Sequence, residues 1–426
     1  MSENENTIYI VDVTNRDGVQ TSRLGLSKLQ KTMINLYLDE MGITRSEFGF
    51  PTTLHELNYL NANLELVERG AIKHLKLNGW IRALSSDVEV AFKNVPKIKN
   101  LNLSMSTSDQ MIQGKFGGKK TKQDVIKQVV EAIETAKKLG TQIIGVNAED
   151  ASRTDDNFLV EFSLKAKEAG ASIIRYCDTL GCDSPDSIYK KIYHLAKTVQ
   201  LPIELHCHND VGMAVANSVM GAKAAIDGGV DAYINTTVNG MGERAGNADL
   251  ASIVLALKKS VGFKDKYKLD PKIKLDTIWK LAKYASYAFS VPIPINQPGV
   301  GNNAFAHESG IHVDGALKDK RNYELYDFHE LGRGEPEIVE TGCMITVGEY
   351  SGIKGFRNIY EKLELDFHSE EEARYILELV RYANVHNQLP LLDNELKFIY
   401  NYPEIAGKIM TVVAPMKEET FTLIKD

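Results

Sequence analysis

The chain has 426 residues, which is too long for a single hydrophobic core, so we expect one large domain and a smaller one. Hydrophobic residues make up 43% of the chain and charged residues 25%, a balance that is typical of globular proteins and excludes a disordered or fibrous chain. With 50 Lys and Arg against 57 Asp and Glu, the net charge of −7 leaves no basic field to hold a nucleic acid or an anionic membrane.

The cysteines and the N-terminus indicate a reducing compartment. The cysteines are too few for a disulfide scaffold and lack the paired CxxC spacing of a structural zinc site. We expect free thiols at Cys177, Cys182, Cys207 and Cys343. The N-terminus, Met1 to Asn6, is polar and acidic, and no run of about 18 apolar residues occurs. We therefore expect a cytoplasmic protein that is neither exported nor membrane-spanning.

Short runs typical of buried strands recur up to about residue 262, each followed by a longer segment with helical periodicity. The expected strands are Ile8–Val13, Ile43–Phe48, Ile72–Leu77, Asn100–Ser104, Gln142–Val146, Ser172–Tyr176, Ile203–Leu205 and Ala232–Thr237. Eight alternating β-α units in roughly 260 residues favour an α/β fold of the closed (β/α)₈ TIM-barrel type over an open sheet. A doubly wound sheet is the alternative, but the chain lacks a GxGxxG turn after its first strand.

Two of the connecting segments carry strong helix signals. Thr121–Leu139 has apolar residues three or four positions apart, as one face of a helix requires. Ser184 and Pro185 form a good N-cap and first turn before the segment Asp186–Val199.

The composition changes after Phe263. A basic stretch at 264–274 precedes a possible helix at Leu275–Ala288, and the proline-rich segment 291–299 then breaks regular structure. Further on, Ser369 begins a capping box that opens another helix. We expect a barrel at 1–265, a linker at 266–302, and a smaller, mostly helical C-terminal domain at 303–426.

A histidine pair ends the seventh expected strand, in Leu205-His206-Cys207-His208. Side chains two positions apart on a strand point to the same side, so His206 and His208 can offer two imidazole nitrogens to one divalent metal. The position favours this role, because barrel active sites form at the carboxyl ends of the strands. Two polar core histidines without a metal are the alternative.

Two loops at the same end of the expected barrel carry further polar groups. Asp17 follows the first strand, which neighbours the eighth in a closed barrel, so it could supply an oxygen ligand. By itself this is a weak signal, since Asp17-Gly18 is a common turn sequence. After the eighth strand, the glycine-rich segment from Asn239 to Asn247 carries Glu243 and Arg244. That composition is typical of a site loop, with a capped turn as the alternative.

Two more strand ends complete the set. Glu149 and Arg153 follow the fifth strand, and Asp178 and Thr179 follow the sixth. Taken singly, each could form a salt bridge or a helix cap. Together, five of the eight expected strand ends carry ionisable or hydroxyl groups, which a barrel stabilised by packing alone does not need. We therefore predict an active site at this end of the barrel.

The combination of these motifs resembles a known family. Asp12-Val-Thr-Asn-Arg-Asp-Gly-Val-Gln20, His206-Cys-His-Asn-Asp210 and Gly242-Glu-Arg-Ala-Gly-Asn247 are similar to motifs of the 2-isopropylmalate synthase, homocitrate synthase and Re-citrate synthase family. These acyltransferases are related to the 3-hydroxy-3-methylglutaryl-CoA lyases. The resemblance runs from about Ile8 to Leu250 and resumes from Val300 to Gly315.

The resemblance implies roles for individual residues. It implies metal ligation by Asp17, His206 and His208, with Asn247 as a possible further ligand. It implies substrate binding by Arg16 and Gln20 at the 2-oxo group, by Thr179 at its carboxylate and by Arg153 at the distal carboxylate. It implies proton transfer by Glu149, Glu243 and His312, with His312 coming from the second domain.

The expected cofactor is one divalent metal ion. Mixed histidine and carboxylate ligation is compatible with manganese, magnesium, zinc or cobalt, so the sequence does not name the ion. The expected substrates are acetyl-CoA and a small 2-oxo acid, condensed with hydrolysis of the CoA thioester. The resemblance also implies a homodimer, and insensitivity to leucine because no further regulatory domain follows residue 426.

A 2-oxo dicarboxylate is the expected acceptor, because a buried carboxylate needs a cation and both Arg153 and Arg82, which ends the third strand unit, could bind one. Most relatives have leucine at the position of Asn15 and glutamate at that of Val19. These two departures favour oxaloacetate, the acceptor of Re-citrate synthases, over the 2-oxoglutarate of homocitrate synthases.

Other functions stay open at this point. They are a 2-isopropylmalate or citramalate synthase, a lyase of the 3-hydroxy-3-methylglutaryl-CoA lyase type, and a non-catalytic barrel stabilised by metal. Lyases of this type usually end soon after the barrel, whereas this chain continues. A structural metal site would be closed and would not need Glu149, Arg153, Thr179 and Glu243 around it.

Overall fold

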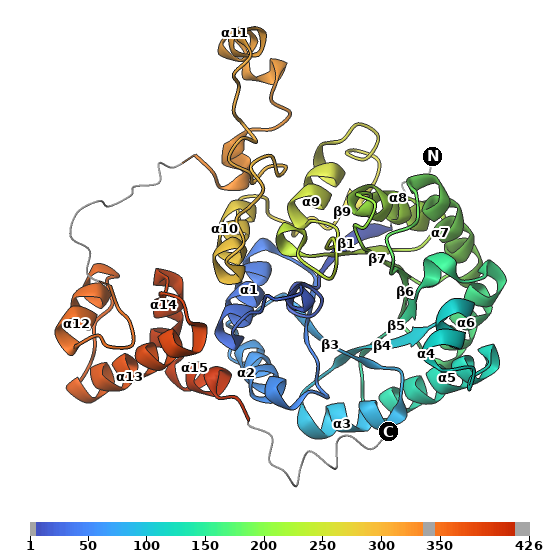
Figure 1. Cartoon of the computed structure of the whole chain (residues 1–426), viewed down its shortest axis with the longest axis horizontal. Helices are drawn as coiled ribbons and strands as arrows, with labels where there is room; N and C mark the ends of the chain where they lie inside the picture. The colour runs from blue at the N-terminus through green and yellow to red at the C-terminus, as the bar shows by residue number, and fades with distance from the viewer. Residues whose placement is uncertain (1–5, 335–345, 414–426) are drawn as a thin grey trace. The chain divides into compact units, whose positions relative to one another are not determined.

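The computed structural model describes residues 6–334 and 346–413. Eight parallel strands form a closed ring, in which each strand pairs with the next and the first also pairs with the eighth (Figure 1). Their bounds are β1 (Thr7–Asp12), β2 (Arg45–Gly49), β3 (Lys76–Arg82), β4 (Asn100–Ser106), β5 (Ile143–Glu149), β6 (Ile173–Asp178), β7 (Ile203–Cys207) and β8 (Ala232–Thr236). The predicted TIM barrel is confirmed, and a short strand, β9 (Lys268–Leu269), adds to β1 outside the ring.

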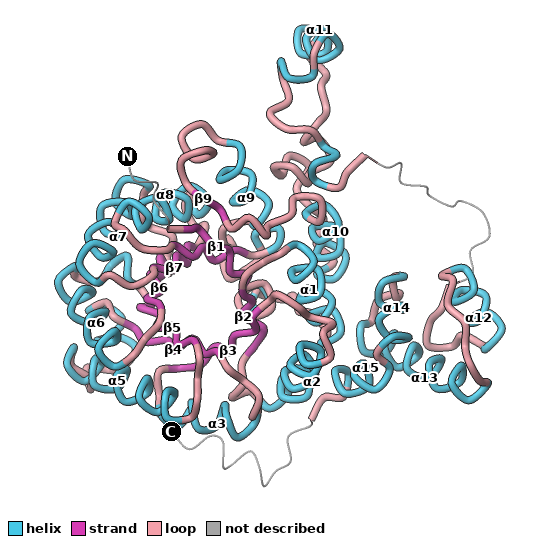
Figure 2. Tube along the Cα trace, turned by 180° about the vertical axis from the view of Figure 1, so that it is seen from behind, coloured by secondary structure: helices cyan, strands magenta, loops and turns pink. Residues whose placement is uncertain are grey.

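Helices connect successive strands of the barrel, two of them between β4 and β5, and three further helices of this part of the chain follow β8. Figure 2 shows the strands as an inner ring, with α3 and α5 to α8 outside it. The bounds are α3 (Ser85–Asn94), α4 (Asp109–Lys115), α5 (Lys122–Lys138), α6 (Asp156–Ala169), α7 (Pro185–Val199), α8 (Ala214–Asp227), α9 (Leu250–Lys259), α10 (Ile278–Phe289) and α11 (Gly310–Lys318).

Contacts between strand β7 and helix α8 fix which way the strand faces. A Cβ added at Gly221 would lie 2.7 Å from the Leu205 side chain, so the glycine lets Leu205 pack closely on the helix. Because successive strand residues point to opposite sides, the neighbouring Glu204 and His206 face the barrel interior. The ligand geometry predicted from the histidine spacing follows from this packing.

The largest difference from the expected elements concerns the third strand, which was expected at Ile72–Leu77 and lies at Lys76–Arg82. Ile72 and Leu75 are buried in the connection before the strand, so in the sequence they resemble strand residues. The sequence pattern did not indicate the observed strand because it contains Gly79, and glycine is a poor strand former. A Cβ at this position would lie 2.7 Å from Ile98, so the packing requires glycine.

The expected helices are confirmed. Thr121 caps α5 in a capping box, and Ser184 caps α7 by accepting a hydrogen bond from the Ser187 N–H. The helix expected at Leu275–Ala288 is α10, which begins later, at Ile278. Residues 291–299 form no helix or strand, as predicted.

A second compact unit comprises residues 26–36, 53–72 and 334–426. Ser369 caps its helix α13 as predicted, and the second hydrogen bond of the cap comes from the N–H of His368 rather than from that of Ser369. Helices α14 and α15 were not expected. Helix α15 packs against α2. Besides the start of α1 (Lys28–Met41), the unit contains α2 (Leu57–Glu68), α12 (Ile353–Lys362), α13 (Glu370–Asn387), α14 (Asp393–Asn401) and α15 (Pro403–Met410).

The two compact units divide the chain differently from the domains expected at 1–265, 266–302 and 303–426. Residues 266–333 group with the barrel, whereas 26–36 and 53–72 group with the C-terminal helices. That residues 303–426 act together at the active site stays a prediction.

Two compositional expectations concern thiols and membranes. Cys177, Cys182 and Cys207 are free thiols, and Cys343 lies outside the described residues. Within residues 6–334 and 346–413, no helix has the length and apolar character needed to cross a membrane.

Candidate active site

Three buried side chains meet at the carboxyl end of the barrel. The Nε2 atom of His206 lies 3.4 Å from Oδ2 of Asp17, and the Nε2 atom of His208 lies 3.8 Å from the same oxygen. Donor atoms of the three residues all lie within 4.8 Å of one another. Ligands about 2.1 Å from one tetrahedral ion are roughly 3.4 Å apart, so this cluster fits the predicted metal site.

The electrostatics of the cluster also fit a metal. Burial lowers the pKa of both His206 and His208, which keeps the imidazoles neutral with a lone pair available. Burial by itself would raise the pKa of Asp17, but the Arg16 guanidinium and the other neighbouring groups outweigh this effect and lower it. Asp17 is therefore an anion beside two neutral nitrogen donors, the mixed donor set of many divalent-metal sites.

Asn247 lies next to the cluster of Asp17, His206 and His208 and contacts it through Asp17. Its amide nitrogen donates a hydrogen bond to Oδ2 of Asp17 at 2.7 Å and another to the Met241 carbonyl at 3.2 Å. This arrangement orients Asp17, and direct ligation by Asn247 stays a prediction. Gly242 makes room for it, because a Cβ there would lie 2.0 Å from the Asn247 amide nitrogen.

The cluster opens into a cavity of about 170 Å³ at this end of the barrel. Most of the predicted site residues line it, and so do several residues that were not predicted. The lining residues are Arg16, Asp17, Gln20, Trp80, Ser104, Asn147, Glu149, Arg175, Cys177, Thr179, His206, His208 and Glu243.

Hydrogen bonds fix several predicted groups in the cavity wall. Glu149 accepts hydrogen bonds from the Ser106 hydroxyl and, at 2.7 and 2.9 Å, from the Lys115 ammonium group. Thr179 accepts a hydrogen bond at 2.9 Å from the Asp150 N–H, which leaves its own hydroxyl hydrogen available to a substrate oxygen. The side chain of Glu243 is 51% exposed, so it lies at the rim.

Two predicted arginines do not line the cavity. The Arg82 side chain is 70% exposed and forms a two-point ion pair with Asp87, at 2.9 and 3.0 Å. Arg153 pairs in the same way with the buried carboxylate of Asp150. Both guanidinium groups therefore already have a carboxylate, and neither lines the cavity beside Asp17, His206 and His208.

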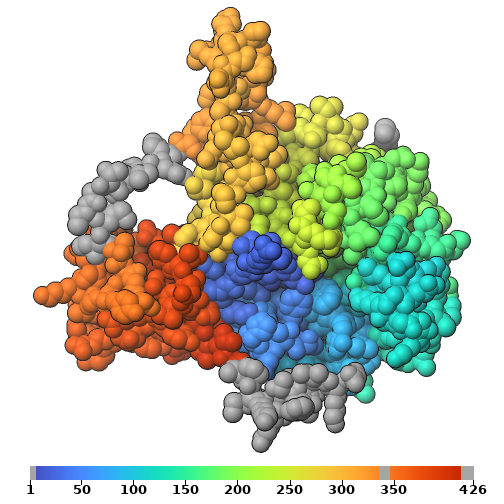
Figure 3. All heavy atoms as spheres, viewed as in Figure 1, coloured from blue at the N-terminus to red at the C-terminus, as the bar shows by residue number. Residues whose placement is uncertain are grey.

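His312 also lies away from the cavity of its own chain. It is exposed on α11, a helix without buried residues, and its ring stacks on Tyr323 with ring centroids 4.3 Å apart. Figures 1 and 3 show the α11 segment projecting from the barrel unit.

Sequence reasoning missed several cavity residues, although strand alternation could have found some of them. Arg175, Cys177 and Thr179 lie two positions apart on β6 and the residue after it, and all three line the cavity. Burial raises the pKa of Cys177 to about 12, so its thiol stays neutral and is not a nucleophile.

A chain of buried ion pairs extends from the cavity into the barrel. Nε of Arg16 donates to Glu47 at 2.7 Å, and Nη2 of Arg175 contacts the other oxygen of Glu47 at 2.7 Å. Arg175 also binds Glu204, which in turn binds Arg45 at 2.9 Å. Burial would raise the pKa of Glu47, but Arg16 and Arg175 outweigh it and hold that pKa below its usual range.

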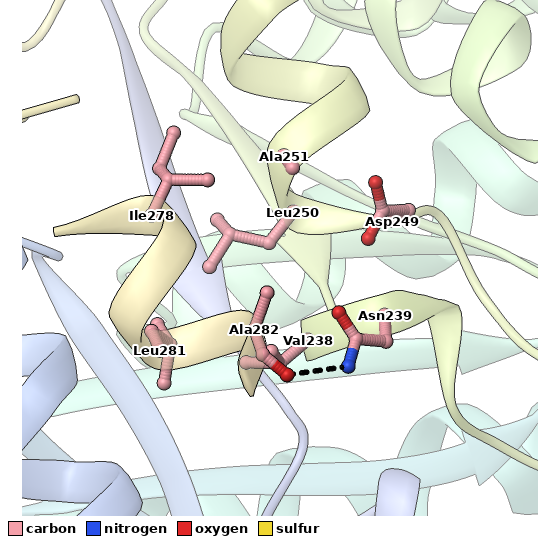
Figure 4. A pocket seen from close by; sticks show the side chains of 8 residues that line it. All are labelled: Val238, Asn239, Asp249, Leu250, Ala251, Ile278, Leu281 and Ala282. Atoms are coloured by element: carbon pink, nitrogen blue, oxygen red, sulfur yellow. Dashed lines mark hydrogen bonds between the residues drawn. The ribbon is translucent and has the colours of Figure 1, made fainter. Parts of the chain in front are cut away.

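A second pocket lies between the loop after β8, α9 and α10 (Figure 4). The Asn239 amide donates a hydrogen bond to the Ala282 carbonyl at its edge. Its volume of about 10 Å³ holds at most one water molecule, so it is not a substrate site.

Two family models match the chain. One, described as HMGL-like, matches residues 7–284. The other, described as homocitrate synthase post-HMGL domain-like, matches residues 300–387.

Individual relatives extend over nearly the whole chain. The chain is 58% identical over 412 residues to a protein of Dehalococcoides mccartyi named citrate (Re)-synthase, covering 96% of this chain and 99% of that protein. It is 39% identical over 407 residues to 2-isopropylmalate synthase 2 of Caldanaerobacter subterraneus, covering 95% and 98%. The solved hydroxymethylglutaryl-CoA lyase of Pseudomonas aeruginosa superposes with a TM-score of 0.55 at 15% identity, covering 68% and 95%, and thus supports the fold.

Proposed function

The chain belongs to the HMGL-like family, and from this we propose that it is a Re-citrate synthase, which condenses acetyl-CoA with oxaloacetate and releases citrate and CoA. The observation that carries the proposal is the 58% identity to citrate (Re)-synthase over 96% of this chain. The buried cluster of Asp17, His206 and His208 supports a metal-dependent reaction.

A divalent metal fits the cluster, and Asp17, His206 and His208 would hold it. When bound, such an ion acts as a Lewis acid toward the 2-oxo group of the acceptor. Manganese, magnesium, zinc and cobalt are all compatible with these donors.

The chain's own residues would orient the acceptor. Glu47 fixes the Nε edge of Arg16 at 2.7 Å, so the guanidinium is held in the cavity wall beside Asp17. Arg16 and Gln20 would donate hydrogen bonds to the 2-oxo acid. Thr179, whose oxygen already accepts a hydrogen bond, would donate its hydroxyl hydrogen to the substrate carboxylate.

Condensation needs a base for the methyl group of acetyl-CoA. Loss of a methyl proton gives an enolate carbon that attacks the keto carbon of oxaloacetate, and the keto oxygen takes up a proton. Water then cleaves the thioester and releases the CoA thiol, which makes the condensation irreversible. Glu149, Glu243 and His312 would carry these protons, and positioned bases typically contribute about 10²–10⁴-fold to rate.

A homodimer is part of the proposal, because His312 does not line the cavity of its own chain. The α11 segment carries exposed apolar side chains, with Ile311 76% and Leu317 83% exposed. We expect a partner to cover these side chains, so that the α11 segment of one chain supplies His312 to the barrel of the other.

Homocitrate synthase, which uses 2-oxoglutarate, is the second candidate. It is supported by the family match at residues 300–387, whose description mentions homocitrate synthase. The two acceptors differ by one methylene, which is worth only about 1–3 kcal/mol in a binding pocket.

Labelled acetyl-CoA tests both the product and the face of attack. Purified enzyme with manganese, oxaloacetate and methyl-¹³C acetyl-CoA should form labelled citrate, and removal of the metal with a chelator should stop it. A citrate lyase that cleaves the pro-S arm should then place the label in oxaloacetate and not in acetate. Labelled acetate would contradict Re-face addition, and the absence of citrate would contradict the function itself.

A further inference from the structure

We propose that Arg175 binds the distal carboxylate of the acceptor and thereby makes the enzyme select a dicarboxylic 2-oxo acid. This inference rests on the proposed function and assigns to Arg175 the role that the sequence had suggested for Arg153 and Arg82. Four observations support it: the position of Arg175, its unused hydrogen-bond donor, the charge of its surroundings and the side chains beside it.

Arg175 lies deep in the cavity wall. It is 1% exposed and precedes Cys177 by two residues on β6, and both side chains line the cavity. Cys177 is the register partner of His206, so Arg175 lies about 6.6 Å further into the barrel along the strand than the level of this metal ligand. A short acceptor held at the metal by its 2-oxo end would extend toward this depth.

The hydrogen bonds of Arg175 use two of the three nitrogens of its guanidinium group, Nε and Nη2. Nε donates to Glu204 at 2.8 Å, and Nη2 contacts both Glu204 and Glu47. Nη1 is buried without a hydrogen-bond partner among the described residues. A buried donor without an acceptor is costly, and a substrate carboxylate would satisfy it with a charge-assisted bond.

The charges of the buried ion-pair chain leave room for an anion. Three arginines, Arg16, Arg45 and Arg175, share two carboxylates, those of Glu47 and Glu204. Asp17 also contacts Arg16, at 3.4 Å, but in the proposed site its charge faces the metal. A buried excess cation is unfavourable, and the second carboxylate of a dicarboxylate would neutralise it.

Two polar side chains continue the site from Arg175 along the barrel wall. Asn147 is its register partner on β5, and Ser104 is the register partner of Asn147 on β4. All three residues line the cavity. The row Ser104, Asn147 and Arg175 therefore presents hydroxyl, amide and guanidinium donors at one level, as a carboxylate requires.

The test compares oxaloacetate with pyruvate, which has the same 2-oxo end and no distal carboxylate. Arg175→Lys keeps the charge beside the two glutamates but removes the forked donor. We expect it to lower the ratio of kcat/KM for oxaloacetate to kcat/KM for pyruvate by about 10- to 100-fold. Arg45→Lys is the matched control: it alters the same ion-pair chain outside the cavity lining and should leave the ratio unchanged.

A second variant keeps the buried arginine and its partners intact. Asn147→Asp is close to isosteric and places a competing carboxylate beside Arg175, so the same ratio should fall in the same direction. Thermal unfolding and metal content of each variant show whether the fold and the metal site are preserved.

The outcomes separate the inference from the proposed function. If the wild-type enzyme forms citrate but both variants slow the two acceptors equally, or Arg45→Lys shifts the ratio as much as Arg175→Lys, the role of Arg175 is wrong and the function stands. If the wild-type enzyme forms no citrate, the function and the inference fall together.

Discussion

His206 and His208 can offer nitrogen donors to one metal ion because strand alternation points both side chains inward and burial lowers the pKa of both, which keeps them neutral. The sequence predicted this pair and Asp17, since the spacing of two residues and the position at a strand end are visible without a structure. Arg82 and Arg153, which were also predicted, do not line the cavity, and their substrate-binding roles stay predictions. Arg82 and Arg153 have carboxylate partners close in the chain, Asp87 and Asp150, and such local ion pairs compete with any role in a distant cavity.

The first prediction concerns metal binding. His206→Ala should weaken Mn²⁺ binding by roughly 100-fold or more and abolish turnover, because it removes one of three protein ligands. His194→Ala on the exposed face of α7 should change neither. Metal content after dialysis and the unfolding temperature of the metal-free proteins are the measurements. Full metal content in His206→Ala would contradict the assignment.

The second prediction concerns Asp12, whose pKa burial raises from 3.8 to about 7. Between these values the folded state binds more protons than the unfolded state, so the free energy of unfolding falls as pH rises, by roughly 1.4 kcal/mol per pH unit at most. Asp12→Asn removes the titrating group and therefore this fall in the free energy of unfolding with pH. Its stability relative to wild type should therefore increase between pH 5 and pH 8 in urea unfolding, and a pH-independent difference would contradict it.

At the scale of elements, the loop 239–247 connects β8 to the cluster of Asp17, His206 and His208. The Asn247 N–H donates to the Gly240 carbonyl at 3.0 Å, and the Asn209 N–H donates to the Gly246 carbonyl at 2.9 Å. The first hydrogen bond closes the loop, and the second holds it against the segment after β7. Its glycine-rich composition predicted a site loop, but the hydrogen bond from Asn247 to Asp17 depends on tertiary packing that composition does not reveal.

The third prediction tests this loop. Gly242→Ala puts a Cβ within 2.0 Å of the Asn247 amide nitrogen, so Asn247 must move and Asp17 loses its hydrogen bond. We expect metal affinity to fall by about 10- to 100-fold, the range found for partners that orient metal ligands. Gly114→Ala on α4, where a Cβ meets nothing within 4 Å, is the control. Equal metal affinity in both variants would show that Asn247 does not support the site.

For the whole molecule, the barrel was predictable because strand and helix periodicities alternate clearly along the chain. The compact units were not, because 26–36 and 53–72 group with the C-terminal helices through contacts between distant parts of the sequence. One such contact pairs Lys408 on α15 with Glu65 on α2 at 2.8 Å. Periodicity reports which residues are buried, and it does not report against which segment they pack.

The fourth prediction tests the proposed dimer. His312→Ala and His206→Ala chains should each be inactive as homodimers. If His312 serves the partner's barrel, a co-expressed mixed dimer contains one intact site, and the mixture should recover about a quarter of wild-type activity by random pairing. Activity no higher than that of the separate variants would show that each site is built from one chain.

The central claim is that the enzyme joins acetyl-CoA to a short dicarboxylic 2-oxo acid. The most direct measurement follows CoA release from acetyl-CoA in parallel with oxaloacetate, 2-oxoglutarate, 2-oxoisovalerate and pyruvate, with and without a chelator. We expect the highest kcat/KM with oxaloacetate and no release with any acceptor after the metal is removed. A higher kcat/KM with 2-oxoglutarate would indicate a homocitrate synthase, and a preference for 2-oxoisovalerate or pyruvate would contradict the selection of a dicarboxylate.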